Sequence, residues 1–309
     1  MKSILSAFTV CLIAAGAFAD REIDVTKPAD FDGRVSVEVK TGQIRLHGWD
    51  RAEVHVVGTL GDHVKELEFN TNGSRTKIVA HLRLGIGQKS VDLDIYVPAG
   101  SELDIETVSA SIQIEDMGGE DIDAQSVSGT IEIDHCEGEI AAETVSGTVS
   151  IAHAAKEVKV QTVSGGISVA GQPSEVEAKT VSGSIVIDGV AESVEVKSVS
   201  GSIRIAGAAL EECVAKTVSG SVRYTGGLVE DGEIDLHSMS GSITVRLSHP
   251  VDGEYRLSSF SGKIRLDLGE GVQLTSARGP GSRLSFEYGD GDAEITVESF
   301  SGSITIEVE

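Results

Sequence analysis

The stretch of sequence that decides the fold is VEVKSVSGSIRIAG, residues 194–207. Apolar and polar residues alternate along its two halves, so Val194 and Val196, and then Ile203 and Ile205, share one side of a strand. The central phrase, T/S-V-S-G-S/T-I-x-I, recurs every 18 to 21 residues from residue 103 onward, with one double-length gap before the last copy. Its central serine is found at Ser109, Ser128, Ser146, Ser164, Ser182, Ser200, Ser219, Ser240, Ser261 and Ser301. A period near 20 residues is typical of solenoids, whose stacked units form a core that no single unit has.

Aligned on this serine, the repeats form columns of like residues. The column three residues after the serine holds Ile112, Ile131, Val149, Ile167, Ile185, Ile203, Val222, Ile243, Ile264 and Ile304. Such uniform columns indicate parallel strands stacked in register. We therefore predict an all-β fold, a right-handed parallel β-helix (β-solenoid) of about 10–11 coils of 18–21 residues with an N-terminal β cap. Gly281, midway in the double-length gap, is interpreted as the mark of an eroded eleventh coil.

The residue before the serine bears on where each coil turns. It is valine in the early repeats and is replaced in the later, longer ones by Met239, Phe260 and Phe300. This growth indicates larger coils that need bulkier filling, and it predicts that the column points inward. Ser200 and Ser202 then point outward, and the corner lies between Lys197 and Ser198. A turn at Ser200-Gly201 is the alternative, because Ser-Gly is a common turn pair.

The first 19 residues resemble a secretory signal. Lys2 is followed by an apolar stretch and by Ala17-Phe18-Ala19, a small-x-small cleavage site before Asp20. The apolar run is shorter than the ~20 residues that span a bilayer, and no segment of the mature chain is long and apolar enough to be an integral membrane segment. We expect a signal peptide at 1–19, an N-terminal β cap with degenerate repeats at 20–101 and β-solenoid repeats at 102–309. The mature protein is then exported, to the periplasm or to the cell surface and beyond.

Charge and cysteine content narrow the choice further. The formal net charge of −24 argues against nucleic acid as a partner and helps to keep a repetitive β protein soluble. Cys136 and Cys213 lie about four repeats apart, which at ~4.8 Å per stacked strand is on the order of 19 Å. A disulfide needs Cα atoms within ~7 Å, so we predict two free thiols, with Cys213 buried in an apolar column.

Three phrases resemble a known family: TGQIRLHGWD at 41–50, YVPAGS at 96–101 and the TVSGSI repeats. They are similar to the bacterial putative-adhesin family of unknown function, exported β-strand repeat proteins related to the head-like domain of autotransporter adhesins. The resemblance spans nearly the whole mature chain. It implies a right-handed β-helix in the cell envelope, and it carries no assigned catalytic residues. This chain lacks the barrel translocator or sorting motif of a complete adhesin.

Outward serine and threonine columns form two parallel hydroxyl ladders that could bind a repetitive polymer such as a glycan. Their longest stretch consists of Ser146, Thr148, Ser164, Ser182, Ser184, Ser200, Ser202, Ser219 and Ser221. The structural alternative is that small residues suit tight coils, where cross-strand hydroxyl pairs contribute only ~0.2–1 kcal/mol each. This alternative is favoured, because repeat faces bind more often through variable loops.

An enzyme is the less favoured alternative. Parallel β-helices include polysaccharide lyases and hydrolases, which need converging carboxylates and commonly aromatic platforms. Here the acids are spread over outward strand positions, and Tyr224 and Tyr255 fall in apolar columns of the core. The eight histidines show no paired metal spacing, and the acidic turns at 116–121 and 289–292 do not match calcium-binding patterns. We therefore predict no catalytic residues, no cofactor and no metal.

The sequence favours an exported, non-enzymatic β-solenoid. Its expected role is to present an elongated surface for adhesion to, or interaction with, a protein or glycan partner of the cell envelope. The alternatives are a carbohydrate-active β-helix enzyme, either lyase or hydrolase, and a periplasmic structural or sensor scaffold.

Overall fold

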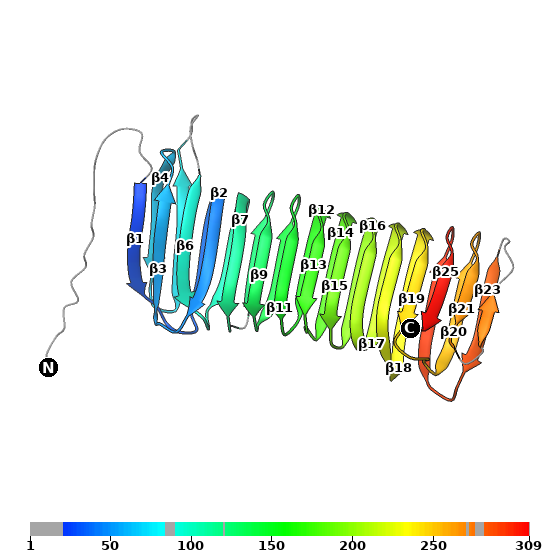
Figure 1. The fold of residues 1–309 in the computed structure, drawn as a ribbon. Coiled ribbons are helices and arrows are strands. Elements are labelled where there is room, and N and C mark those ends of the chain that lie inside the picture. The colour runs from blue at the N-terminus through cyan, green and yellow to red at the C-terminus, as the bar shows by residue number, and fades with distance from the viewer. Residues whose placement is uncertain (1–20, 84–89, 120, 270–271, 276–280, 309) are drawn as a thin grey trace.

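The computed structural model describes residues 21–83, 90–119, 121–269, 272–275 and 281–308. The predicted signal peptide and Cys11 lie outside the described residues. The described chain is all β, with no helix in these ranges, and its strands stack side by side into an elongated rod (Figure 1). Its first strands are β1 (Arg21–Pro28), β2 (Arg34–Trp49), β3 (Glu53–Leu60), β4 (Val64–Thr71), β5 (Arg75–Leu82), β6 (Val91–Pro98), β7 (Glu102–Met117), β8 (Asp121–Ser126), β9 (Ile131–Cys136), β10 (Glu139–Thr144), β11 (Val149–Ala154) and β12 (Val158–Ser164). They are followed by β13 (Ile167–Gly171), β14 (Glu175–Ser182), β15 (Ile185–Val190), β16 (Ser193–Ser200), β17 (Ile203–Ser219), β18 (Val222–Ser240), β19 (Ile243–Leu247), β20 (Gly253–Ser259), β21 (Ile264–Asp267), β22 (Gln273–Thr275), β23 (Ser282–Tyr288), β24 (Ala293–Ser299) and β25 (Ile304–Val308).

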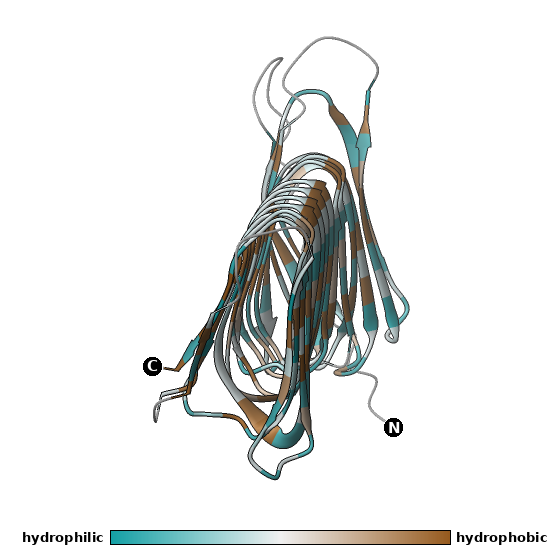
Figure 2. Cartoon of the chain, turned by 90° about the vertical axis from the view of Figure 1, so that its right-hand side faces the viewer, coloured by the Kyte–Doolittle hydropathy of each residue, from teal (hydrophilic) through white to brown (hydrophobic). Residues whose placement is uncertain are grey.

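The repeats stack in parallel and in register, as the columns predicted. Each repeat contributes one strand before its turn and one after it, and each strand pairs with the strands of the neighbouring repeats. Ile203 of β17 is the Cα partner of Ile185 in β15 and of Val222 in β18. Seen along the rod, the turns of successive repeats superpose (Figure 2). The all-β, parallel solenoid prediction is therefore confirmed, while the right hand of the coil stays a prediction.

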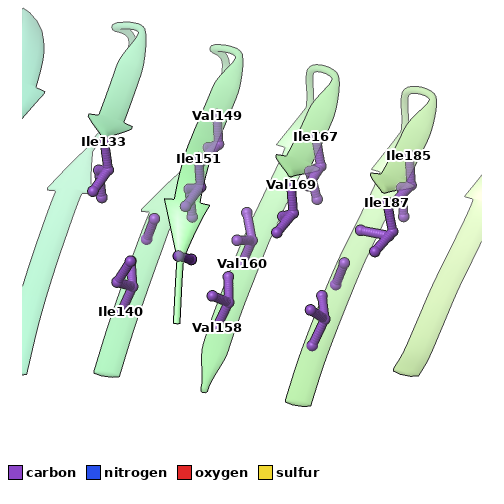
Figure 3. Close-up of a cluster of buried hydrophobic side chains, with 14 of the residues drawn as sticks. Ile133, Ile140, Val149, Ile151, Val158, Val160, Ile167, Val169, Ile185 and Ile187 are labelled. Atoms are coloured by element: carbon purple, nitrogen blue, oxygen red, sulfur yellow. The ribbon is translucent and has the colours of Figure 1, made fainter. Parts of the chain in front are cut away.

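The core is a continuous file of aliphatic side chains between the two sides of the rod. Successive repeats supply like residues at like positions, such as Val149, Ile167 and Ile185, all of which are buried. Figure 3 shows these side chains in matching places on successive strands. Burying a valine or isoleucine side chain stabilises the fold by ~1.5–3 kcal/mol, and each coil buries its row only because a neighbour covers it. Tyr224 and Tyr255 are fully buried, as predicted.

The corner of each repeat lies at the Ser-Gly pair, which was the alternative interpretation. Alternation continues unbroken through Val194, Val196 and Ser198, all of which are buried, so Val199 points outward. The predictions of an inward-pointing column before the serine and of a corner between Lys197 and Ser198 are therefore wrong. Period-2 parity of the strand decides the direction of Val199, and the size of the residue in that column does not.

The beginning of the rod combines parallel and antiparallel strands. β2 pairs in parallel with β5, β6 and β7, so its residues 34–47 form a row equivalent to those of the repeats. β1 and β3 pair antiparallel with each other, β3 pairs antiparallel with β6, and β4 with β5. Antiparallel strands of this kind close the first coil against edge pairing.

The far end of the rod does not follow the order of the chain. β24 lies between β18 and β20, since Ile295 is the Cα partner of both Ile234 and Tyr255. β25 lies in the same way between β19 and β21. Figure 1 shows the red C-terminal strand inserted between yellow and orange ones. β23 pairs antiparallel with β20, so the residues that follow Gly281, which was interpreted as the mark of an eroded eleventh coil, form an antiparallel capping strand.

Candidate binding surface

A ridge of exposed apolar side chains runs along the rod beside the turns. We use the term ridge for the residues just before each repeat serine: Val108, Val127, Val145, Val163, Val181, Val199, Val218, Met239, Phe300 and Phe260, in spatial order. The seven valines are each 46 to 50% exposed. The rings of Phe260 and Phe300 stack with centroids 4.8 Å apart. Contiguous exposed apolar patches are found at interaction sites more often than elsewhere on protein surfaces.

A shallow groove of about 840 Å³ follows the ridge over seven repeats, from Glu106 to Val218. One wall is the ridge, and the other is the column three residues before each serine. Between them lies the column two residues before each serine, whose side chains are buried. The groove exists because two outward residues of a strand flank one inward residue, and this arrangement repeats at the ~4.8 Å strand spacing.

Hydroxyl groups of this middle column lie beneath the groove, on the inward side of the strand. At the far end of the rod these hydroxyls donate to the carbonyl of a glycine in an adjacent repeat. Ser299 Oγ donates to Gly241 O at 3.0 Å and Ser238 Oγ to Gly220 O at 3.1 Å. In the middle of the groove, several buried hydroxyls have no hydrogen-bond partner among the described residues: Thr144, Thr162, Thr180, Ser198 and Thr217.

Charge changes sign along two outward columns, one on each side of the turn: the first stands beside the ridge, and the second lies on the strand after the turn, on the other side of the rod. The leading flank, three residues before each serine, consists of Glu106, Gln125, Glu143, Gln161, Lys179, Lys197 and Lys216. The trailing flank, four residues after each serine, consists of Gln113, Glu132, Ser150, Ser168, Val186, Arg204 and Arg223. None of these side chains is buried. Both flanks run from acids and amides near the N-terminal end to cations near the other, in a protein with a net charge of −24.

The two predicted hydroxyl ladders lie on the turns, next to the ridge. Ser164, Ser182, Ser200 and Ser219 follow one another as Cα partners, and all are exposed. The second ladder is exposed too, with Ser221 Oγ 3.4 Å from Ser202 Oγ. The structure thus brings the predicted serines into two files, and their role in binding stays a prediction.

Acidic side chains line a second depression, of about 460 Å³, on the face of β7, β8, β10 and β12. Its acids are Glu102, Asp104, Glu106, Asp121, Asp123, Glu139 and Glu157. Arg34 hydrogen-bonds to Glu102, and Lys159 forms an ion pair with Glu157. None of the described lining residues is aromatic or a histidine, so the depression offers no ring on which a sugar could stack.

An aromatic cluster lies on the outer face of the N-terminal strands. The rings of His47, Trp49, His55 and Tyr96 lie 5.1 to 6.2 Å apart, and three of the four pairs are stacked. Arg51 lies over the Trp49 ring. Because the rings face one another across neighbouring strands, they stabilise this end of the rod and leave little free ring face for a ligand.

Sequence reasoning missed a cluster of one acid and two histidines. His135 and His153 lie in neighbouring repeats, and their rings stack with centroids 4.3 Å apart. Asp134 Oδ1 is 2.7 Å from His153 Nδ1 and 3.1 Å from His135 Nδ1. The hydrogen bond from His153, together with the charge of both rings, lowers the pKa of Asp134. The 18-residue spacing of the two histidines, one repeat, was the signal that could have revealed the cluster.

Both cysteines of the described chain are free, and Cys213 is buried, as predicted; Cys136 is buried as well. Burial raises the pKa of the Cys136 thiol to about 11 and raises that of Cys213 further. The thiolate is the reactive form of cysteine, so these two side chains have the character of core residues. The described part of the chain also contains no helix with the length and apolar character that crossing a bilayer requires.

Comparison with known proteins places the chain in a family. Similar solved structures include a putative adhesin from Bacteroides fragilis NCTC 9343, 11% identical, with a TM-score of 0.39 over 94% of this chain and 97% of that one. A putative cell adhesion protein from Clostridium sporogenes ATCC 15579 is 11% identical, with a TM-score of 0.20 over 94% and 100%. A putative lipid binding protein from Parabacteroides distasonis ATCC 8503 is 14% identical, with a TM-score of 0.28 over 95% and 97%. Among curated proteins, none matches this chain.

The family model covers the repeats and the N-terminal strands together. It matches residues 3–188 and again residues 137–307, so two overlapping matches span almost the whole sequence. Matches that overlap in this way are expected of a repeat protein, since the same unit can align at more than one place. The chain belongs to the Toastrack DUF4097 family.

Proposed function

We propose that the protein is an exported, non-enzymatic β-solenoid that presents an elongated surface for adhesion to, or interaction with, a protein or glycan partner of the cell envelope. The observation that supports this proposal is the groove beside the ridge, which is lined by equivalent residues of seven successive repeats. A rigid surface with a regular spacing can bind an extended partner without paying the entropy of ordering itself. The predicted signal peptide at 1–19 and the cap at 20–101 belong to the same proposal.

The groove supports this function better than the hydroxyl ladders do. Its wall combines apolar valines with polar side chains that could fix the orientation of a partner, the usual composition of binding sites. The ladders offer small hydroxyl groups alone, whose pairing contributes ~0.2–1 kcal/mol each. The groove and the first ladder share one edge of the rod, so one set of variants can separate them.

The test is binding of the mature chain to envelope extracts and to a glycan array. A groove variant carries Val145→Ser, Val163→Ser and Val181→Ser, and a ladder variant carries Ser164→Ala, Ser182→Ala and Ser200→Ala. We expect the groove variant to lose the captured partner and the ladder variant to retain it. Loss in the ladder variant alone would move the binding face to the hydroxyl columns. Retention by both variants would contradict this proposal.

Among the described residues, the acidic depression is the feature that favours a carbohydrate-active enzyme, because several carboxylates line it. Incubation with a glycan panel tests this alternative, and release of oligosaccharides that stops in a Glu139→Gln variant would support it. A periplasmic scaffold is the other alternative. Protease treatment of intact cells separates it from surface adhesion, because a periplasmic protein survives until the envelope is opened.

A further inference from the structure

We propose that the ridge and its leading flank bind the same surface of a second copy of this chain, with the two rods antiparallel and related by a two-fold axis at Gln161. This inference rests on the proposed function, since it names the partner that occupies the same groove. The ridge supplies the apolar contact. Its seven half-exposed valines, from Val108 to Val218, extend over six strand spacings, or about 29 Å.

A second copy matches the spacing of this surface at every coil. Both partners repeat at the same ~4.8 Å, so contacts made at one coil recur at the next without adjustment. A two-fold interface uses the same patch on both subunits, and each residue pair then occurs twice. Such a patch must be complementary to itself, and that requirement can be checked against the charges of the leading flank.

The charges of the leading flank are complementary to those of a second copy only when the two copies run antiparallel. A two-fold axis at Gln161 places Glu143 opposite Lys179 and Glu106 opposite Lys216. Gln125 then faces Lys197, and Gln161 faces its own copy. Every acid of this flank therefore meets a lysine.

The trailing flank lies on the strand after the turn and faces the other side of the rod, so it takes no part in this contact. Opposite charges across an interface fix its register and speed association, whereas like charges reject the wrong alignment.

A parallel pair of rods lacks this complementarity. Coils of the same number would then lie at the same level, so each acid of the leading flank would be level with its own copy and each lysine with its own copy. The column two residues before the leading flank does not share the antiparallel complementarity, since Asp123 would oppose Glu195. The contact is therefore confined to the ridge and its leading flank.

The lysines remain available for a partner. Lys179 and Lys197 form ion pairs with Glu177 and Glu195 on their own strands, and Lys216 lies 3.0 Å from Asp235. Their side chains are nevertheless 38 to 47% exposed. An ammonium group has three donors, so a second carboxylate from another copy can be added.

The first test is a mixing experiment by sedimentation velocity at low salt. The wild-type mature chain is expected to be a dimer that dissociates as the salt concentration rises, because exposed ion pairs are screened. Lys179→Glu and Glu143→Lys each place like charges across the axis twice, and each is expected to weaken the dimer at least about tenfold. Mixed in equal amounts, the two variants restore both opposite-charge contacts and are expected to form a heterodimer. Separate variants that dimerise as the wild type does, or a mixture that stays monomeric, would overturn the antiparallel register.

The second test is disulfide trapping at two positions of the leading flank. Gln161→Cys lies on the axis and is expected to cross-link to its own copy. Glu106→Cys lies about 29 Å from its own copy and is expected to remain monomeric. Cross-linking of Glu106→Cys to itself would show parallel rods. A wild-type chain that is monomeric at every concentration, yet captures an envelope partner through the groove, would refute this inference and leave the proposed function standing.

A second observation carries an independent inference: we infer that Asp134, His135 and His153 form a binding site for a divalent transition-metal ion such as Zn²⁺. One ligand atom from each of the three residues lies within 4.8 Å of the other two. Two imidazoles and a carboxylate are the ligand types that suit Zn²⁺ and Ni²⁺. Both rings are exposed at the surface, with 58 and 64% of each side chain accessible, so they can turn toward an ion.

The backbone places the two histidines at equivalent turn positions of neighbouring repeats. His135 and His153 have φ angles of 51° and 52°, in the left-handed region that residues other than glycine rarely adopt. Asp116 one repeat earlier and Gly171 and Gly189 in later repeats have a positive φ at the same position, so this turn recurs along the rod and sets both histidines at equivalent places one coil apart.

Isothermal titration of the mature chain with ZnCl₂ tests the site, because it measures the ion alone. We expect one ion per chain, with the affinity lowered at least about tenfold in both His153→Asn and Asp134→Asn. The matched control is His237→Asn, a histidine that is also paired with carboxylates but lies in a different repeat. Equal affinity in His153→Asn and His237→Asn, or no binding tighter than about 1 mM in the wild type, would overturn the assignment.

Discussion

The carbonyl oxygen of Gly147 occupies the place where a Cβ of residue 165 would lie. The same relationship links the turn glycines of neighbouring repeats along the rod, as between Gly183 and Gly201. The repeated glycine therefore sets how closely one coil can approach the next. Glycine is needed at this position because the backbones of neighbouring coils touch along the rod axis. A special backbone conformation is not the reason, since none of the three turn glycines Gly165, Gly183 and Gly201 has a positive φ.

Replacing this glycine should destabilise the rod strongly. Gly165→Ala places a methyl group on the Gly147 carbonyl and forces the coils apart, and we expect the free energy of unfolding to fall by about 2–3 kcal/mol. Gly166→Ala is the matched control, because a Cβ there would have its nearest neighbour, Ser184 O, at 3.7 Å. Urea unfolding of the two variants measures the difference. Equal midpoints would mean that the coils tolerate the methyl group.

Unpartnered hydroxyls beneath the groove predict a stabilising substitution. Thr180 Oγ1 is buried without a hydrogen-bond partner among the described residues, so Thr180→Val removes a desolvation penalty and preserves the shape. We expect the free energy of unfolding to rise by about 1 kcal/mol. Ser299→Ala removes the donor to Gly241 O and is expected to lower it by about 1 kcal/mol. Changes of the same sign in the two variants would contradict this account.

The sequence was sufficient to predict the stacking of the repeats, because a period-2 pattern within each unit and like residues in each column leave few other arrangements. It was insufficient for the column before the serine. The growth from valine to Phe260 and Phe300 resembled the filling of a core, whereas parity from Val196 through Ser198 turns this column outward. The candidate groove was therefore missed, since its wall was assigned to the interior. Alternation counted through the serine, one residue at a time, would have found it.

Burial of Cys136 predicts both chemical inertness and a loss of stability at alkaline pH. Its pKa is raised by burial from 9.0 to about 11, so the folded chain keeps a proton that the unfolded chain releases. The contribution of this protonated thiol to the free energy of unfolding is fully present below pH 9 and is lost as the pH rises toward 11. We expect iodoacetamide to leave Cys136 unlabelled at pH 8 until urea is added, as read by mass spectrometry. Cys136→Ala should show a smaller fall in melting temperature between pH 9 and 11 than the wild type.

Identical pH profiles of the wild type and Cys136→Ala would contradict this account. Rapid labelling of native Cys136 would do so as well. Cys213 is the internal control for labelling, because burial raises its pKa still further, and it should react only when the chain unfolds.

The inserted C-terminal strands predict that the end of the chain stabilises residues that precede it. Ile295 is fully buried between Ile234 and Tyr255, so it occupies an interior coil although it lies close to the C-terminus. Ile295→Ala should lower the free energy of unfolding by about 2–5 kcal/mol, as an interior isoleucine does. Deletion of residues 290–309 should remove the hydrogen-exchange protection of β20 and β21, because both lose their parallel partner. Leu284→Ala in the capping strand β23 is the control and should cost less, since Leu284 is only partly buried. Unchanged protection of β20 after the deletion would show that β20 can stack on β18 without the inserted coil.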